Sequence, residues 1–85
     1  MRFVFVERSW EDYLYWQSTN KKILNRINSL LKDISRNPFK GMGLPEPLKH
    51  EYAGCWSRRI NKEHRLIYQV KEDAIIIYKC RLHYD

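Results

Sequence analysis

The stretch CWSRRINKEHRLIYQVKEDAIIIYKCRLHYD, residues 55–85, decides the fold of this chain. It contains runs rich in β-branched and aromatic residues, and such runs predict strands. The predicted strands are residues 55–60, 64–70 and 74–83. The short polar segments between them predict turns at residues 61–63 and 71–73. Strands joined by turns this short form an antiparallel meander.

The segment before the meander predicts one strand followed by two helices. Residues 2–7 are rich in Phe and Val and predict the strand. Ser9, with the acidic Asp12 three positions later, predicts the N-cap of a helix that runs to about residue 18. Asn20 predicts the N-cap of a second helix that runs to about residue 35, before Asn37-Pro38.

Both helices carry residues that we expect to be buried. The second helix has apolar residues at the helical period, which predict one buried stripe: Ile23, Ile27, Leu30, Leu31 and Ile34. In the first helix, large side chains are expected to pack in the core: Trp10, Tyr13, Leu14 and Trp16.

These elements predict an α+β fold in one small domain over residues 1–85. Two N-terminal helices pack on one face of a mainly antiparallel, twisted sheet and leave the other face open. Residues 39–54 have no clear periodicity, and a loop of this length in a compact domain is usually functional or disordered. Because Pro45 and Pro47 restrict its backbone, we expect a held shape.

Composition narrows the class of partner. The chain has 16 Lys and Arg against 10 Asp and Glu, a net charge of +6, which favours a polyanion or an acidic protein partner. The sequence shows no signal peptide. No stretch approaches the length of a membrane span, which needs about 18 apolar residues. Cys55 and Cys80 lack metal-ligand spacing, so we expect reduced, buried thiols, with a single disulfide as the alternative, and neither metal nor cofactor.

Cationic side chains gather in the predicted meander: Arg58, Arg59, Arg65, Arg81 and His83. If the first turn is the three residues 61–63, Arg59 lies directly opposite Arg65 on the same face. Two adjacent guanidiniums destabilise a sheet unless they are well solvated or share an anion, and the fork of arginine suits phosphate. A two-residue turn would place them on opposite faces, and two solvated arginines remain the alternative.

A carboxylate and an imidazole complete a candidate site for RNA cleavage. Glu46 lies between Pro45 and Pro47, close to Lys49, and is a candidate general base; a simple salt bridge to an arginine is the alternative. His83 is a candidate general acid or base, although a histidine so near the end of a chain is more often a tail residue. Tyr84 beside it has a side chain that stacks on bases in single-strand binders.

Several segments resemble the YoeB (Txe) branch of the RelE-type bacterial toxins, from end to end of the chain. They are Asp12-Tyr13-Leu14-Tyr15-Trp16-Gln17, Pro45-Glu46-Pro47-Leu48-Lys49-His50, Trp56-Ser57-Arg58-Arg59-Ile60, Glu63-His64-Arg65-Leu66 and Cys80-Arg81-Leu82-His83-Tyr84. The resemblance implies a RelE-like fold and a cytoplasmic, metal-independent endoribonuclease that cleaves mRNA in the ribosomal A site. It also implies a YefM-type antitoxin partner and a tendency to form homodimers.

The resemblance assigns roles to individual residues. Glu46 corresponds to the general base, His83 to the general acid and Arg65 to the residue that stabilises the transition state. The site also includes Tyr84, and Lys49 and Arg59 correspond to substrate-binding residues. The family pattern commonly ends at the tyrosine, whereas Asp85 follows here and adds a carboxylate near His83. The competing hypotheses are a non-catalytic RNA- or ribosome-binding translation inhibitor and a degenerate toxin that acts in autoregulation with its antitoxin.

Overall fold

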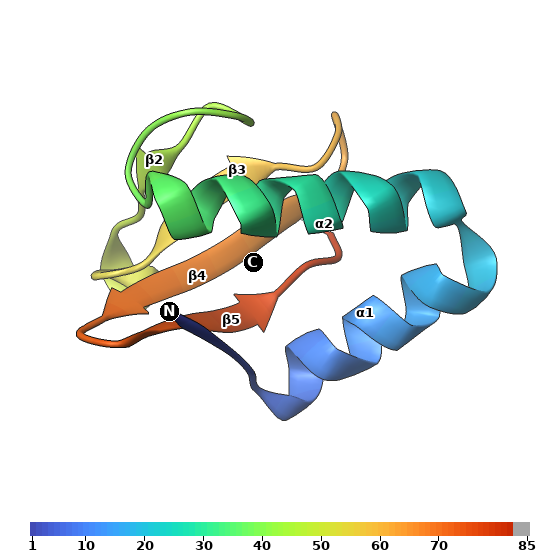
Figure 1. The fold of residues 1–85 in the computed structure, drawn as a ribbon, viewed down its shortest axis with the longest axis horizontal. Helices are drawn as coiled ribbons and strands as arrows, with labels where there is room; N and C mark the ends of the chain where they lie inside the picture. Colours follow the sequence, from blue (N-terminus) through green and yellow to red (C-terminus); the bar gives the residue numbers. More distant parts are fainter. Residues whose placement is uncertain (83–85) are drawn as a thin grey trace.

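The computed structural model describes residues 1–82, which form one five-stranded sheet covered by two helices (Figure 1). The strand order is β1-β5-β4-β3-β2. The strands are β1 (Arg2–Phe5), β2 (Glu46–Pro47), β3 (Trp56–Arg59), β4 (Arg65–Lys71) and β5 (Ala74–Lys79). Only the β1–β5 pair is parallel among these strands, so the prediction of a mainly antiparallel sheet is confirmed.

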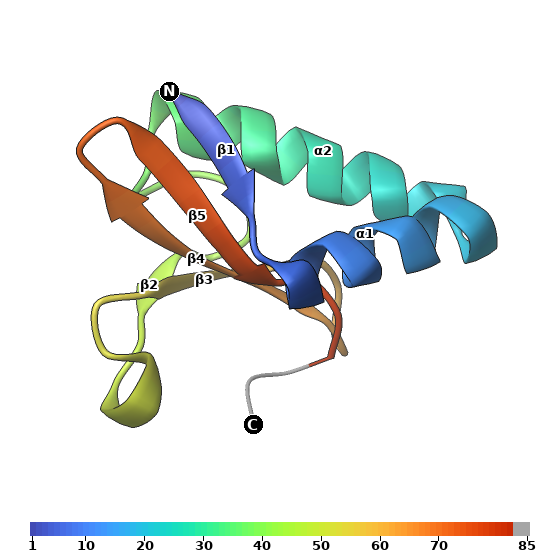
Figure 2. The same cartoon turned by 90° about the horizontal axis from the view of Figure 1, so that it is seen from below.

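The helices are α1 (Glu7–Thr19) and α2 (Lys21–Arg36), and both lie on the same side of the sheet (Figure 2). The Asn20 side chain accepts a hydrogen bond from the Ile23 backbone N–H at 3.1 Å, which confirms the predicted cap. The buried stripe of α2 is Leu24, Ile27, Leu30, Leu31 and Ile34, whereas Ile23 is half-buried. The α+β fold with helices on one face of the sheet is confirmed.

The predicted start of the first helix was wrong. The helix begins at Glu7, and Val6 occupies the N-cap position without a side-chain bond. Ser9 lies inside the first turn, fully buried, and its hydroxyl is within hydrogen-bonding distance of the carbonyl oxygens of Val6 (3.0 Å) and Ile77 (2.6 Å). Ser9, which was predicted to cap the helix, therefore links α1 to β5 instead.

The predicted end of the last strand was also wrong, because β5 stops at Lys79 rather than at residue 83. Both backbone polar groups of the next residue, Cys80, form hydrogen bonds with side chains of α1. Its N–H donates to Asp12 Oδ2 at 3.1 Å, and its carbonyl accepts from Trp16 Nε1 at 2.8 Å. These bonds to α1 take the place of ladder hydrogen bonds at Cys80, where the strand has ended.

The expected core role of the α1 aromatics holds only in part. Trp16 is buried, but Trp10 is 48% exposed and Leu14 is also exposed. Trp10 stacks on Tyr13 with ring centroids 5.8 Å apart, and Tyr13 packs against Phe5 of β1. The side of α1 that faces the sheet is narrow and includes the polar Ser9 and Asp12, so the aromatics spread towards the surface.

Candidate active site

Cross-strand register places three of the predicted site residues on one face of the sheet. Glu46 pairs with Ser57, and Arg59 pairs with Arg65, which confirms the predicted pairing of the two arginines. Directly paired residues project to the same side, and side chains alternate along a strand. Ser57 and Arg59 therefore point away from the helices, and so do their partners Glu46 and Arg65. Diagonal neighbours such as Glu46 and Arg59 are about 7–8 Å apart in a sheet of this kind.

Glu46 also lines a hollow of about 330 Å³ formed by residues 46–52. The sequence predicts irregular structure here, but the chain instead forms β2, followed by a 3-10 turn at His50–Tyr52. β2 pairs with β3, and the residues that follow it are hydrogen-bonded to Cys55, just before β3: Leu48 N–H donates to Cys55 O and Cys55 N–H donates to Tyr52 O, each at 2.9 Å. The held shape expected from the two prolines is confirmed.

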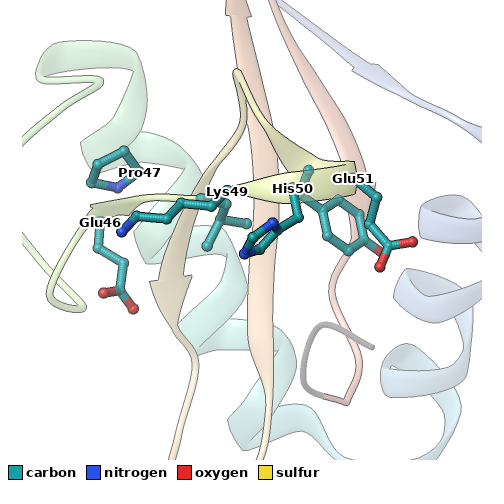
Figure 3. A pocket seen from close by; sticks show the side chains of 7 residues that line it. Glu46, Pro47, Lys49, His50 and Glu51 are labelled. Atoms are coloured by element: carbon teal, nitrogen blue, oxygen red, sulfur yellow. The ribbon is translucent and has the colours of Figure 1, made fainter.

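The side chains of this hollow combine opposite charges with an imidazole (Figure 3). Glu46, Lys49 and His50 all line it, and all three side chains are exposed. In Figure 3 the Glu46 carboxylate and the His50 imidazole extend from the same side of the segment. A carboxylate can accept a proton there, and an ammonium can bind a phosphate oxygen.

The paired arginines differ in their surroundings. Arg59 is exposed, whereas Arg65 is only 7% exposed. The Nη1 group of Arg65 donates to the carbonyls of Asn61 (2.8 Å), Lys62 (3.3 Å) and His64 (3.2 Å). These bonds to carbonyl oxygens offset the cost of burying the Arg65 charge, and so help it to pair with Arg59. They also fix Arg65 in place, and a fixed charge stabilises a transition state better than a mobile one.

Arg58 lies apart from the paired Arg59 and Arg65, contrary to the prediction that it shares a cationic cluster with them. Its side chain is 0% exposed on the helix side of the sheet, where Nη1 contacts Asp33 Oδ2 at 2.7 Å. The same guanidinium donates to the carbonyls of Asn37, Lys40 and Met42, so it holds the start of the long loop. The hydrogen bond from Arg58 is the largest cause of the lowered pKa of Asp33.

The side chain of Arg81 lies against α1. Its guanidinium lies over the ring of Tyr15 in α1, 3.8 Å from the ring centroid, and its carbonyl accepts from Arg8 Nη2 at 3.4 Å. The predicted site residues His83 and Tyr84, and the additional Asp85, lie outside the described residues.

His64 has a role that sequence reasoning missed. It precedes β4, is buried, and its Nδ1 accepts a hydrogen bond from the Leu82 backbone N–H at 2.7 Å. No local pattern reveals this contact, because the two residues are 18 positions apart.

The two cysteines are free thiols and both are buried, as expected. Burial raises the pKa of Cys80 to about 12, so its thiolate is not accessible as a nucleophile at neutral pH. Within residues 1–82, no three His, Cys, Asp or Glu side chains are grouped to hold a metal ion. No helix in the same range has the length and apolar character needed to cross a membrane.

Comparison with known proteins identifies the family. The model of the YoeB-like toxin of bacterial type II toxin–antitoxin systems matches residues 5–84. The chain belongs to the YoeB toxin family. It is 56% identical to Toxin YoeB of Escherichia coli strain K12 over 84 residues, covering 99% of this chain and 100% of that protein.

Solved structures agree with this membership. The YoeB dimer from Staphylococcus aureus is 46% identical and superposes with a TM-score of 0.93, covering 99% of this chain and 98% of that one. A YoeB–YefM complex from the same organism gives a TM-score of 0.92 at 47% identity, with the same coverage. The chain is therefore a YoeB-type toxin of a type II toxin–antitoxin system, and the resemblance seen in the sequence is confirmed.

Proposed function

We propose that this toxin is an endoribonuclease that cleaves mRNA in the A site of the 30S subunit of translating ribosomes and so inhibits translation. The observation that carries the proposal is the register that gathers Glu46, Arg59 and Arg65 on the face of the sheet opposite the helices. This face offers a proton acceptor beside two cations, which is what cleavage of a phosphodiester by its own 2′-hydroxyl requires. Family membership and the net charge of +6 support an RNA substrate.

In this proposal each site residue has one chemical role. Glu46 takes the proton from the ribose 2′-hydroxyl, and the resulting oxygen attacks the adjacent phosphorus. Arg65 balances the added negative charge, and His83 protonates the departing 5′-oxygen with Tyr84 beside it. The products are a 2′,3′-cyclic phosphate and a 5′-hydroxyl. These steps use side chains alone, with no metal or cofactor.

Lys49 and Arg59 serve as substrate-binding residues in the same proposal. Both are exposed, and both are near Glu46: Lys49 lines the same hollow, and Arg59 is its diagonal neighbour across β2 and β3. Their charges can engage phosphates on either side of the bond that is cut.

The proposal extends to partners and location. An antitoxin of the YefM type would bind this toxin, as YefM does in the Staphylococcus aureus complex, and a homodimer would correspond to the dimer of the same relative. A protein that acts on ribosomes works in the cytoplasm. Size-exclusion chromatography with light scattering, with and without a YefM-type antitoxin, checks both associations.

The test is primer extension on mRNA in a reconstituted translation system, with the wild type, Glu46→Gln and His83→Gln. New 5′ ends within the A-site codon are expected only with the wild type. A matched control is Glu51→Gln, which removes an exposed carboxylate from the same hollow and should leave cleavage intact. An mRNA with a single 2′-deoxy nucleotide at the cut position should resist cleavage.

Two outcomes would overturn the proposal. Binding to ribosomes and arrest of translation without new 5′ ends would indicate a non-catalytic inhibitor. Formation of an antitoxin complex without arrest by the free chain would indicate a degenerate toxin.

A further inference from the structure

Leu82 has an unusual backbone conformation that must be held by other residues. Its φ is +68°, in the left-handed region that side chains with a Cβ disfavour. Both of its backbone polar groups bond to adjacent residues near the start of β4. The N–H donates to His64 Nδ1 at 2.7 Å, and the carbonyl accepts from the Arg65 N–H at 3.0 Å.

His64 is itself held in one orientation. It is 7% exposed, and its ring packs edge-on against Trp16 with centroids 4.7 Å apart and an interplanar angle of 73°. Because Nδ1 accepts the Leu82 N–H, the proton of the neutral imidazole is on Nε2. Nε2 lies 3.6 Å from a carboxylate oxygen of Glu63, which favours that tautomer.

The residues before Leu82 are tied to α1 rather than to the sheet. Asp12 and Trp16 bind the backbone of Cys80, and the Arg81 guanidinium lies on the ring of Tyr15. His64 and Arg65 then provide the last attachment along residues 80–82. With both of its polar groups bonded, to His64 and to Arg65, the backbone of Leu82 is fixed in its left-handed conformation.

We propose that His64 is a positioning residue: it holds the main chain at Leu82, the residue directly before the proposed general acid, in the conformation that the proposed reaction requires. This inference rests on the function proposed above. It assigns His64 no contact with RNA and no proton transfer. In this proposal His64 holds the main chain next to the general acid, and its neighbour Arg65 stabilises the transition state through its side chain.

Three substitutions separate positioning from packing. His64→Phe keeps an aromatic ring against Trp16 and removes the acceptor. His64→Asn places an oxygen acceptor at the δ position, where Nδ1 was, and His64→Gln moves the acceptor one bond further along the side chain. All three remove the imidazole, so only the place of the acceptor distinguishes Asn from Gln.

The first measurement is the single-turnover cleavage rate on programmed ribosomes as a function of toxin concentration. Misplacing a reacting group by about 1 Å can cost about 100-fold, so we expect His64→Phe and His64→Gln to cut about 10- to 100-fold more slowly at saturation. The toxin concentration for half-maximal rate should stay within about threefold of that of the wild type. His64→Asn should restore most of the saturated rate.

The second measurement is hydrogen exchange of the Leu82 amide by NMR, which requires no activity. The amide should be protected in the wild type and in His64→Asn and should exchange faster in His64→Phe. Urea unfolding of each variant controls for stability. A saturated rate that follows the free energy of unfolding, rather than the presence of the δ acceptor, would overturn the inference.

The two proposals fail in different ways. If the wild type cuts mRNA and His64→Phe cuts equally fast, the positioning role is wrong and the proposed function stands. If the wild type cuts no mRNA although its Leu82 amide is protected, the proposed function is wrong, and the positioning role falls with it.

Discussion

Replacing Arg58 with methionine should destabilise this protein severely, although the side chains have similar length. Arg58 is fully buried, and its guanidinium donates to the carbonyls of Asn37, Lys40 and Met42 and to the Asp33 carboxylate. Each carbonyl that loses its donor costs about 1 kcal/mol. The three carbonyls alone thus predict a loss of about 3 kcal/mol or more, consistent with the about 3–5 kcal/mol typical of a broken buried ion pair.

Such a loss is large for a domain of this size, whose free energy of unfolding is typically about 5–15 kcal/mol. The assay is urea unfolding of the purified protein, followed by tryptophan fluorescence because Trp16 is buried and Trp56 packs against the core. The midpoint of thermal unfolding should fall by more than about 12 °C.

Arg59→Met is the matched control, since it makes the same change at the exposed neighbouring position of the same strand. Its free energy of unfolding should stay within about 0.5 kcal/mol of that of the wild type. If Arg58→Met lost less than about 1 kcal/mol, or no more than Arg59→Met, the claim that Arg58 holds the loop from within would be refuted.

Other properties of the fold are open to measurement as well. The pKa of Asp33 is lowered chiefly by its hydrogen bond from Arg58, so the ionised carboxylate stabilises the folded state. This contribution is complete above about pH 5 and is lost as the pH falls below the usual carboxyl value of 3.8. The urea midpoint should therefore drop less steeply from pH 5.5 to pH 3 in Asp33→Asn than in the wild type. Asn20→Ala should cost about 1 kcal/mol in urea unfolding through loss of the α2 cap, whereas Asn25→Ala, at an exposed position within the helix, should cost nothing. Burial raises the pKa of both Cys55 and Cys80, so a thiol reagent should label neither in the native protein at pH 8 and both in urea; rapid native labelling would contradict the buried placement.

Features set by neighbouring residues could be predicted. The α2 helix follows from its apolar period and from the Asn20 cap, both of which act within one or two turns. The pairing of Arg59 with Arg65 follows from the length of the turn between them, because turn length sets the register of a hairpin. The segment around Glu46 is held as its prolines indicated, although its pairing with β3 could not be seen from local sequence.

Features set by distant residues could not be predicted. Ser9 suits a helix cap by its chemistry, but its hydroxyl meets a carbonyl of β5. Residues past Lys79 continue the strand pattern, yet the backbone of Cys80 bonds to Asp12 and Trp16 of α1 instead. The parallel pairing of β1 with β5 joins the two ends of the chain, and no local signal encodes it.

The sequence by itself determined the class of fold and the toxin family to which the chain belongs, but it left the pairing of Arg59 with Arg65 dependent on the length of one turn. Only the tertiary structure decided which cations face solvent. Arg58 and Arg59 are adjacent and chemically identical, but alternation along β3 turns the first towards Asp33 of α2 and leaves the second exposed. The reason is physical: periodicity and caps depend on nearby residues, whereas the partner that makes a buried charge tolerable is brought in by packing from elsewhere in the chain.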